Sequence, residues 1–377
     1  NKNMQKKWSS LGLMSGTSGD GVDASIIRTN GINEYNSIKD KYYEYDTGIH
    51  RDIHDLKEKI HKIEDLETYK SEIDNLERRI TVFHAGVIKD LNVSDDIIIG
   101  FHGQTIYHNP EKKISKQLGN GKLLNQLVKK DIIFDFRNND ILNGGQGAPL
   151  TPIFHHLISY QNKIKLPICF LNIGGISNIT IIKDINDLSG LISKDIGPGN
   201  CLIDAWVRKN SNKKFDLDGK IALSGVRNEI FFEQAQELYR NRKNKKKISF
   251  DTNDFDISFL RGLSLEEGVT TLTDFTASII GEELSLSLKN LKDKVQDILL
   301  CGGGRKNPVL LKKIKKNISI DINLRLIDEY KVDGDFIESQ AFAFLAVRSV
   351  LKLPISFPNT TGCKMPCTGG KLIKKLN

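Results

Sequence analysis

Gly12-Leu-Met-Ser-Gly-Thr-Ser-Gly-Asp-Gly-Val-Asp23 is the stretch of this chain that decides its fold. Residues 9–29 read as an apolar strand, a turn rich in Gly, Ser and Thr, and a second strand that alternates with period two from Val22 to Arg28. Glycines permit positive φ and a close approach of the backbone, so the N–H groups of such a turn can converge on an anion. The stretch predicts two successive strands whose turn suits a phosphate group.

Three further glycine-rich segments follow or lie between strand-like runs. They are Leu171-Asn-Ile-Gly-Gly-Ile-Ser-Asn178, Asp195-Ile-Gly-Pro-Gly-Asn200 and Leu300-Cys-Gly-Gly-Gly-Arg-Lys-Asn-Pro308. Several such loops in this order indicate a nucleotide held between two domains, as in a phosphotransferase. The succession of strand, glycine turn and strand recurs at 168–183, which is a weak internal repeat typical of two related α/β domains facing one another across a cleft.

Length and composition describe an ordinary two-domain globular protein. The chain has 377 residues, too many for one compact core, with 39% hydrophobic and 27% charged residues. Its net charge of +8 lies in scattered Lys clusters without interleaved aromatic residues, so we expect no nucleic-acid partner. No secretory h-region and no apolar run of membrane-spanning length occur, so we expect a cytoplasmic protein that does not contact membranes.

The cysteines are expected to be reduced thiols. Their number, five, is odd, and two of them lie inside apolar strand-like runs. Cys363 and Cys367 could bind a metal in principle, but their spacing lacks a second ligand pair. No set of His, Asp and Glu residues shows zinc-ligand spacing either.

The rest of the chain supplies the domain boundaries. Residues 50–91 have the three-to-four spacing of packing helices, and residues 131–137 read as a buried strand. The breaker-rich loop Asn143–Pro152 marks a crossing between domains, and an Ala- and Phe-rich helix over 336–351 returns the chain to the first domain. We predict an α/β protein with one domain at 1–150 plus 346–377 and the other at 151–345.

Two carboxylates stand where strands and helices meet. Asp195 ends an apolar strand, and Asn200 is a plausible N-cap of a helix from Cys201. Such a carboxylate projects toward ligands in open α/β folds, or it only braces the turn. Glu338 opens the late helix and either faces a ligand or favours the helix N-terminus electrostatically.

Polar side chains after two other strands could recognise a substrate. His102-Gly-Gln-Thr105 suits a hydroxyl-rich ligand, although His102 could equally be a structural histidine. Arg137 could fork onto a carboxylate or phosphate, or form a structural ion pair. His155 and His156 read as packing residues of an apolar helix.

With these motifs, the chain resembles the anhydro-N-acetylmuramic acid kinase family of actin-like sugar kinases. The resemblance runs from the first strand to the last helix and is most specific in Met14-Ser-Gly-Thr-Ser18 and Gly145-Gln-Gly-Ala-Pro-Leu150. The other matching segments are Gly100–His108, Asp135–Arg137, Leu171–Asn178, Asp195–Asn200, Asp204–Trp206, Cys301–Pro308 and Glu338–Phe344.

The resemblance implies two actin-like (ribonuclease H-like) ATPase domains flanking a nucleotide cleft. It also implies that ATP and water convert 1,6-anhydro-N-acetylmuramic acid to N-acetylmuramate 6-phosphate and ADP, in peptidoglycan recycling and amino-sugar catabolism. Asp195 would be the base that activates the water, and Glu338 would help to hold the substrate and that water. The family further implies Mg²⁺ as a cofactor and a homodimer.

The resemblance also implies contacts for single residues. The residues implied to bind the nucleotide are Gly16, Thr17, Ser18, Gly19, Asp20, Gly21, Val22, Asp23, Gly174, Gly175, Asn178, Gly197, Gly199, Asn200, Gly302, Gly303, Gly304 and Asn307. The residues implied to bind the sugar are Ser15, His102, Gln104, Thr105, Arg137, Gln146, Asp195 and Glu338. Mg²⁺ would be held by Asp20 or Asp23, directly or through water.

The chain departs from the family pattern in three places. Gly19 replaces the usual Leu of the first turn and should loosen it. Ile248 and Thr252 stand where relatives often have basic residues, which puts any contact there in doubt. Leu13 replaces the acidic residue that often opens the first phosphate motif in the superfamily, so metal contacts would come from Asp20, Asp23, Asp195 or phosphate-bound water.

Two alternative functions remain open on sequence alone. One is a kinase of another sugar in the same superfamily, with the same phosphate loops and different substrate residues. The other is a non-enzymatic actin-like ATP-binding module, in which Asp195 would be a switch residue. A pure nucleotide switch would not need the set formed by His102–Thr105, Gln146 and Glu338.

Overall fold

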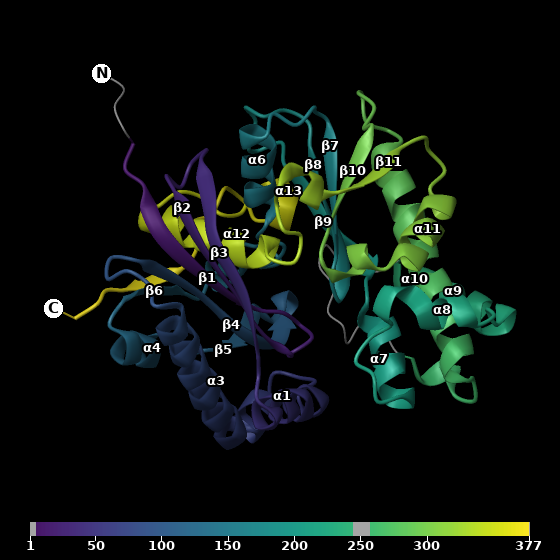
Figure 1. Ribbon diagram of the computed structural model, residues 1–377, viewed down its shortest axis with the longest axis horizontal. Helices are drawn as coiled ribbons and strands as arrows, with labels where there is room; N and C mark the ends of the chain where they lie inside the picture. The colour runs from purple at the N-terminus through teal and green to yellow at the C-terminus, as the bar shows by residue number, and fades with distance from the viewer. Residues whose placement is uncertain (1–4, 244–256, 377) are drawn as a thin grey trace. The chain divides into compact units, whose positions relative to one another are not determined.

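The computed structural model describes residues 5–243 and 257–376, which divide into two compact units. Unit 1 comprises Asn1–Ile164, Asn186–Leu191 and Phe336–Asn377, and unit 2 comprises Lys165–Ile185 and Ile192–Asp335. Each unit is a mixed α/β structure built on a single sheet (Figure 1). No helix among the described residues is long and apolar enough to cross a membrane.

This division differs from the one predicted from the sequence in where the chain crosses. Helix α6 (Pro152–Gln161) belongs to unit 1, because the Phe154 ring packs 5.1 Å from that of Tyr35 and 5.9 Å from that of Phe344. The whole of α12 (Ile337–Val350) also belongs to unit 1. Aromatic packing of α6 therefore moves the first crossing past the breaker-rich loop, and the last crossing comes before α12 and not within it.

Unit 1 contains a sheet of seven strands in the order β12-β6-β4-β1-β2-β3, with β5 paired to β4. Strands β1, β2 and β3 form an antiparallel meander, and β4 and β6 continue the sheet parallel to β1. The strands are β1 (Trp8–Ser15), β2 (Gly21–Thr29), β3 (Tyr35–Glu44), β4 (Ile98–Asn109), β5 (Ile114–Leu118), β6 (Asp131–Phe134) and β12 (Lys371–Ile373). The strand-turn-strand prediction for residues 9–29 is confirmed.

Unit 2 repeats this arrangement with five strands in the order β11-β10-β7-β8-β9. An antiparallel meander comes first, and β10 and β11 then join parallel to β7. The strands are β7 (Ile168–Ile173), β8 (Ile176–Ile182), β9 (Ile192–Pro198), β10 (Asp297–Cys301) and β11 (Asn323–Leu326). The internal repeat predicted from the glycine turns is therefore real, and its strand order is that of the expected ribonuclease H-like fold.

Helices cover both faces of the unit 1 sheet. Because side chains alternate along a strand, Leu11 and Leu13 of β1 join the core beneath α1 and α3, whereas Ser10 and Gly12 face α12. The helices of unit 1 are α1 (Thr47–Lys59), α2 (Asp65–Thr68), α3 (Lys70–Leu91), α4 (Gly121–Val128), α5 (Asn138–Leu142), α6, α12 and α13 (Pro358–Thr361).

The core of unit 2 is built by helices on its sheet and beside it. Helices α10 and α11 pack on β7, β8 and β10, and α7, α8 and α9 form a second apolar cluster with α10. The helices are α7 (Cys201–Asn210), α8 (Lys220–Ser224), α9 (Glu229–Lys243), α10 (Leu265–Leu288) and α11 (Pro308–Asn317).

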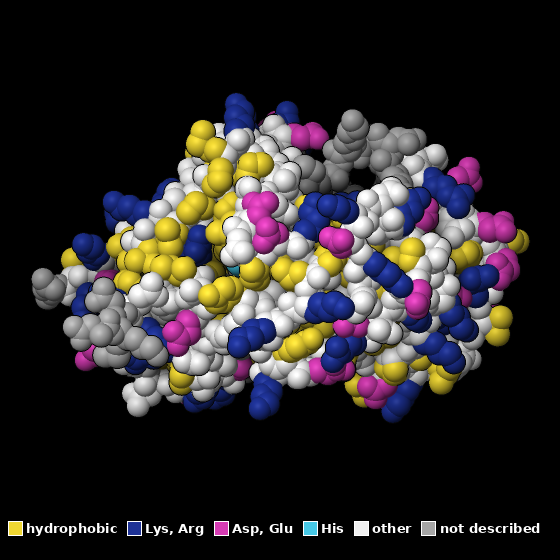
Figure 2. Space-filling model, turned by 90° about the horizontal axis from the view of Figure 1, so that it is seen from above, with side chains coloured by type: hydrophobic (Ala, Val, Ile, Leu, Met, Phe, Trp, Pro, Cys, Tyr) yellow, Lys and Arg dark blue, Asp and Glu magenta, His cyan; other side chains and the backbone are white. Residues whose placement is uncertain are grey.

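On the face drawn in Figure 2, Lys and Arg side chains are interspersed with Asp and Glu and form no single continuous patch.

A pair of glycines lets α12 lie directly on the unit 1 sheet. Gly12 of β1 and Gly100 of β4 are partners in register. A Cβ at Gly12 would lie 1.8 Å from the Ser339 carbonyl oxygen, and one at Gly100 would lie 2.6 Å from that of Phe342. Since both obstacles are helix backbone, no rotamer change can relieve them.

We predict that Gly12→Ala destabilises unit 1 by about 3 kcal/mol, the upper end of overpacking costs, because α12 must lift from β1. Urea unfolding measures this change. The matched control is Gly86→Ala in α3, where an added Cβ meets nothing within 4 Å and should be neutral or stabilise by up to about 1 kcal/mol. Equal effects of the two changes would contradict the proposed contact.

Candidate active site

The first two glycine turns of unit 2 are joined by backbone hydrogen bonds. The Gly199 N–H donates to Gly175 O at 2.9 Å, and the Asn200 N–H donates to Gly174 O at 2.7 Å. A Cβ at Gly199 would lie 2.0 Å from Gly174 O, so only glycine fits there. The turn between β7 and β8 and the end of β9 therefore form one continuous backbone surface.

The third glycine segment of unit 2 lies against the same surface. Gly302 has a φ of +82°, and a Cβ there would lie 2.6 Å from Asn172 Oδ1. The nearest atom to a Cβ on Gly303 would be Asn200 Nδ2, at 4.0 Å. The three segments that the sequence singled out in this unit thus lie together, at the ends of β7, β9 and β10.

Asp195 lies on β9 beside a β-bulge. Asn178 pairs with Asp195 and Ser177 with Gly197, which leaves Ile196 as the extra residue. Ile196 is buried in the core of unit 2, whereas Asp195 is partly exposed. Bulges often re-aim side chains next to active sites, and this one lies where the glycine turns meet.

Two other predicted nucleotide ligands of unit 2 occupy helix N-caps. Asn307 caps α11, because its side chain accepts a hydrogen bond from the Leu310 N–H at 3.0 Å. Asn200 holds the N-cap position of α7 as predicted, but its side chain makes no capping hydrogen bond. The N–H of Asn200 is instead committed to Gly174.

Arg137 and His102 form a hydrogen-bonded pair in unit 1. His102 Nδ1 lies 2.7 Å from Gly103 O and donates to it, so its Nε2 accepts from Arg137 Nε at 3.0 Å. A second guanidinium nitrogen of Arg137 donates to Gly147 O at 2.8 Å. Arg137 lies at the N-cap of α5, past the end of the short strand β6, so the strand predicted over 131–137 ends earlier than expected.

The pKa shifts of His102 and Glu338 show how these two residues interact with Arg137. Burial, and then the Arg137 guanidinium, lower the pKa of His102 well below its usual value, so this histidine is neutral and positions Arg137. Burial raises the pKa of Glu338 at the start of α12, and the charge of Arg137 opposes that shift. Arg137, His102 and Glu338 thus belong to one electrostatic group, and the ring of Phe342 lies 5.8 Å beneath the guanidinium.

The other predicted sugar ligands occupy varied positions in unit 1. Gln104 is fully buried and donates to Gly16 O at 3.0 Å, and buried Ser15 shares a 2.7 Å hydrogen bond with the Tyr45 hydroxyl. These two residues brace the first turn. Thr105 accepts a hydrogen bond from Gln117, and the backbone N–H of Gln146 donates to Thr361 O.

The first glycine turn is tight, contrary to the expectation that Gly19 loosens it. The Gly19 N–H donates to Gly16 O at 3.1 Å, and Gly19 has a φ of +66°. A Cβ there would lie 2.9 Å from Ile53 of α1, and Lys57 of the same helix donates to Thr17 O. Thr17 and Ser18 are exposed at the tip of the turn. Ile248 and Thr252 lie outside the described residues.

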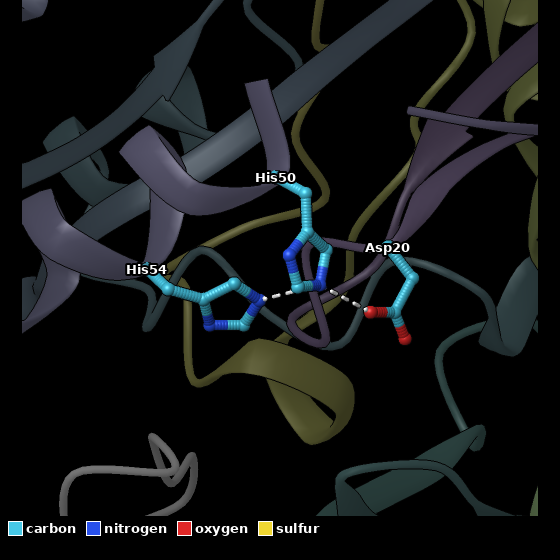
Figure 3. Close-up of side chains that lie close together, drawn as sticks. All are labelled: Asp20, His50 and His54. Atoms are coloured by element: carbon cyan, nitrogen blue, oxygen red, sulfur yellow. Dashed lines mark hydrogen bonds and ion pairs between the residues drawn. The ribbon is translucent and has the colours of Figure 1, made fainter. Parts of the chain in front are cut away.

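The structure brings together two groups with metal-ligating side chains that sequence spacing missed. One is Asp20, His50 and His54 (Figure 3), and the other adds Asp140 to the cysteine pair Cys363 and Cys367. The expectation concerned spacing along the chain, and the structure adds a set of Asp and His side chains that meet only in three dimensions. The i, i+4 spacing of the two histidines on a helix was the signal available.

The second group is structural. The Asp140 carboxylate accepts hydrogen bonds from Ser356, Thr361 and the Gly147 N–H. Burial raises the pKa of both thiols, that of Cys367 to about 12. Protonated thiols are poor metal ligands, so Asp140 serves to fix the loop that carries Gly147.

Comparison with known proteins assigns the chain to a family. A family profile described as anhydro-N-acetylmuramic acid kinase matches residues 9–375. Curated proteins of that name are similar over their whole length: one from Pelagibacter ubique is 53% identical, covering 98% of this chain and 100% of its own. One from Agrobacterium fabrum is 35% identical, covering 97% and 98%. The chain belongs to the anhydro-N-acetylmuramic acid kinase family.

Among solved structures, a ROK family glucokinase from Streptomyces griseus in complex with glucose and AMPPNP aligns with 11% identity and a TM-score of 0.40, covering 89% of this chain and 98% of that one. Membership of the anhydro-N-acetylmuramic acid kinase family makes the protein a phosphotransferase that uses ATP and acts on small molecules.

In this family member, Arg305 anchors the third glycine segment, a role that sequence reasoning missed. Its buried guanidinium donates to both oxygens of Asp328 at 2.8 and 2.9 Å, to Asp335 at 2.7 Å and to Gly302 O at 3.0 Å. The Gly302 N–H in turn donates to Gly334 O. We call these contacts of Arg305 with Asp328, Asp335 and Gly302 the Arg305 latch. It cannot be read from the sequence, because Asp328 and Asp335 lie more than twenty residues from Arg305.

We predict that Arg305→Ala lowers the free energy of unfolding by about 2 kcal/mol. This is below the cost of breaking a fully buried ion pair, because the remaining carboxylates are partly exposed. Chemical denaturation measures the loss. Arg325→Ala is the matched control, since that partly exposed arginine pairs with Asp297 and Glu329 and should cost less than about 1 kcal/mol.

The same latch predicts a pH dependence. Arg305 lowers the pKa of Asp328, and Lys306 and Arg305 together overcome burial to lower that of Asp335. A carboxylate whose pKa is lowered in the folded state stabilises the fold at pH values above its unfolded pKa of about 3.9. This stabilisation is lost as the pH falls through the lowered pKa. The stability difference between the wild type and Arg305→Ala should therefore shrink below about pH 4. A difference that stays constant down to acid unfolding would contradict this account.

Proposed function

We propose that the protein opens 1,6-anhydro-N-acetylmuramic acid with water and phosphorylates its O6, yielding N-acetylmuramate 6-phosphate and ADP. The observation that carries the proposal is the full-length family match together with Asp195 at a bulge among the glycine turns. We further propose that this reaction serves peptidoglycan recycling in the cytoplasm and that the protein acts as a homodimer.

Asp195 is the proposed general base. Its carboxylate accepts a proton from water, and the water oxygen forms a bond to the anomeric carbon as the bond from that carbon to the bridge oxygen breaks. The released bridge oxygen is O6, and it attacks the γ-phosphorus of ATP in line while the bond to the β,γ-bridging oxygen breaks. One proton moves to Asp195, and the electron pair of the broken bond leaves with ADP. Positioning and electrostatics supply most of the rate.

The glycine turns are proposed to bind the nucleotide. Backbone N–H groups of the 16–23 turn in unit 1 and of the 174–178 turn in unit 2 are suited to phosphate oxygens. Gly302, Gly303 and Gly304 would pack against adenosine. A Cβ at Gly302 or Gly304 would collide with β7, so these two glycines also let the segment lie close to that strand. Asn307 would act indirectly, as the cap of α11.

Mg²⁺ is the proposed counter-ion of the phosphates. Asp20 and Asp23 fit it chemically, since carboxylate oxygens and water are the ligands Mg²⁺ prefers. Both residues are partly exposed in or next to the first turn, so either could hold the ion directly or through water. When bound, Mg²⁺ would neutralise developing phosphate charge.

The Arg137 group is proposed to bind the sugar. Two hydrogen bonds orient the guanidinium, which leaves it suited to a forked contact with the lactyl carboxylate. Glu338, whose pKa is raised by burial, would hold the sugar and the reacting water. Gln146 would complete the contacts, and Gln104, Ser15 and Thr105 would support them from within unit 1.

Asp195→Asn should reduce turnover at least about a hundredfold, the lower range for a general base, and leave ATP affinity nearly unchanged. The change keeps side-chain size and removes only the basicity. Turnover is measured as ADP release with the anhydro sugar, and affinity by calorimetric ATP titration. A variant that retains more than about a hundredth of normal turnover would show that another group is the base.

Incubation with Mg-ATP in ¹⁸O-labelled water tests the function itself. We expect label at the anomeric hydroxyl of the product and ADP in equal amount when the substrate is the anhydro sugar. Phosphorylation only of ordinary sugars, without label incorporation, would refute this proposal in favour of another sugar kinase. ATP binding without any transfer would indicate a nucleotide-binding module.

Arg137→Lys should lower kcat/KM for the anhydro sugar by about 10- to 100-fold, the value of a charge-assisted hydrogen bond, with little effect on KM for ATP. Lysine keeps the positive charge but lacks the two parallel N–H donors of the guanidinium. The matched substrate is 1,6-anhydro-N-acetylglucosamine, which lacks the lactyl carboxylate and should be used equally poorly by both proteins. An equal loss with both substrates would contradict the carboxylate assignment.

A further inference from the structure

Asp20, His50 and His54 form a compact cluster at the side of the first glycine turn (Figure 3). Asp20 directly follows the turn, and the two histidines lie one helical turn apart on α1. His50 Nε2 is 3.0 Å from Asp20 Oδ1 and 3.2 Å from His54 Nε2, and one ligand atom from each residue lies within 4.8 Å of the others. Three nitrogen and oxygen donors therefore meet at one point.

A single linear hydrogen bond at His50 Nε2 accounts for one of its two short distances and not for both. A ring nitrogen is either a donor or an acceptor, and it makes one in-plane hydrogen bond. If His50 Nε2 carries a proton toward Asp20, it has no lone pair for His54. If it accepts from His54, two lone pairs face each other across the 3.0 Å to Asp20. A cation that receives all three lone pairs removes this conflict.

We propose that Asp20, His50 and His54 bind a divalent transition-metal ion of the Zn²⁺ class. Zinc takes imidazole nitrogen and carboxylate oxygen at about 2.0–2.1 Å in tetrahedral geometry, which places ligand atoms about 3.3 Å apart. The distances of 3.0 and 3.2 Å around His50 are close to that spacing. Two imidazoles distinguish this site from one for Mg²⁺, which prefers oxygen ligands, and with Asp20 in this site Asp23 is the carboxylate left for Mg²⁺.

Gly19 leaves space for this site. A Cβ at Gly19 would lie 3.5 Å from His54 Nε2 and 2.9 Å from Ile53, so a larger side chain at this position would crowd the histidine. The positive φ of Gly19 also lets the chain turn so that Asp20 follows directly beside α1.

The surroundings favour a cation that arrives from solvent. The side chains of His50 and Asp20 are 32% and 33% exposed, so the donors are accessible without unfolding. The carboxylates of Asp20, Asp23 and Glu44 all act electrostatically on Tyr42, so negative charge is gathered on this side of the turn. The ammonium of Lys57 on α1 is engaged by Thr17 O.

A bound ion would cross-link the first turn to α1. Asp20 supplies one ligand from the turn, and the helix supplies two, in addition to the existing contact between Lys57 and Thr17. This inference does not depend on the proposed sugar substrate, because its primary readout is metal bound to the whole protein.

The test uses the full chain freed of metals with a chelator and then titrated with Co²⁺ and Zn²⁺. We expect one ion per chain, an intense visible absorption of tetrahedral Co²⁺, and its loss when Zn²⁺ is added. His54→Ala should weaken binding by at least about 100-fold, since even loss of a supporting residue around a metal costs 10- to 100-fold. His50→Ala should do the same.

His61→Ala is the matched control, because that exposed histidine follows α1 without belonging to the cluster. It should bind Co²⁺ like the wild type. Binding that survives both His50→Ala and His54→Ala, no saturable binding to the wild type, or displacement of Co²⁺ by equimolar Mg²⁺ would each overturn the proposal. Circular dichroism of the variants separates loss of ligands from loss of folding.

Discussion

The contact between α12 and the glycine pair of β1 and β4 is the constraint on which unit 1 depends. Backbone packs on backbone there, since Gly12 and Gly100 leave no side chain between sheet and helix. The contact brings the last long helix back to the first strand across more than three hundred residues. Because α12 carries both Glu338 and Phe342, the same contact sets Glu338 within the electrostatic reach of Arg137.

In unit 2, hydrogen bonds and the Arg305 latch hold the three glycine segments in place. The two glycine turns bond to each other through Gly174, Gly175, Gly199 and Asn200, and Arg305 ties the third segment to its acidic loop. These interactions fix the backbone, and Gly174 and Gly175 stay partly exposed and Gly303 exposed. A fixed glycine backbone of this kind fits the proposed binding of phosphate and adenosine by main-chain groups.

The first turn of unit 1 is held in a different way. Gly19 and Lys57 pin it against α1, and Gln104 braces it from β4. The proposed metal cluster would add a third tie to the same helix. The turn is therefore constrained on several sides, although its tip, at Thr17 and Ser18, is exposed.

The sequence by itself determined the α/β class, the repeated meander and the family, because glycine turns and strand alternation are local patterns. It also located Asp195, Arg137, His102 and Glu338 as candidates. Only the tertiary structure decided which of them are partners, that Asn307 caps a helix and that Gln104 braces a turn. The domain boundary, the Arg305 latch and the cluster of Asp20 with two histidines likewise depend on residues distant in sequence, whose meeting is set by packing and leaves no local pattern to read.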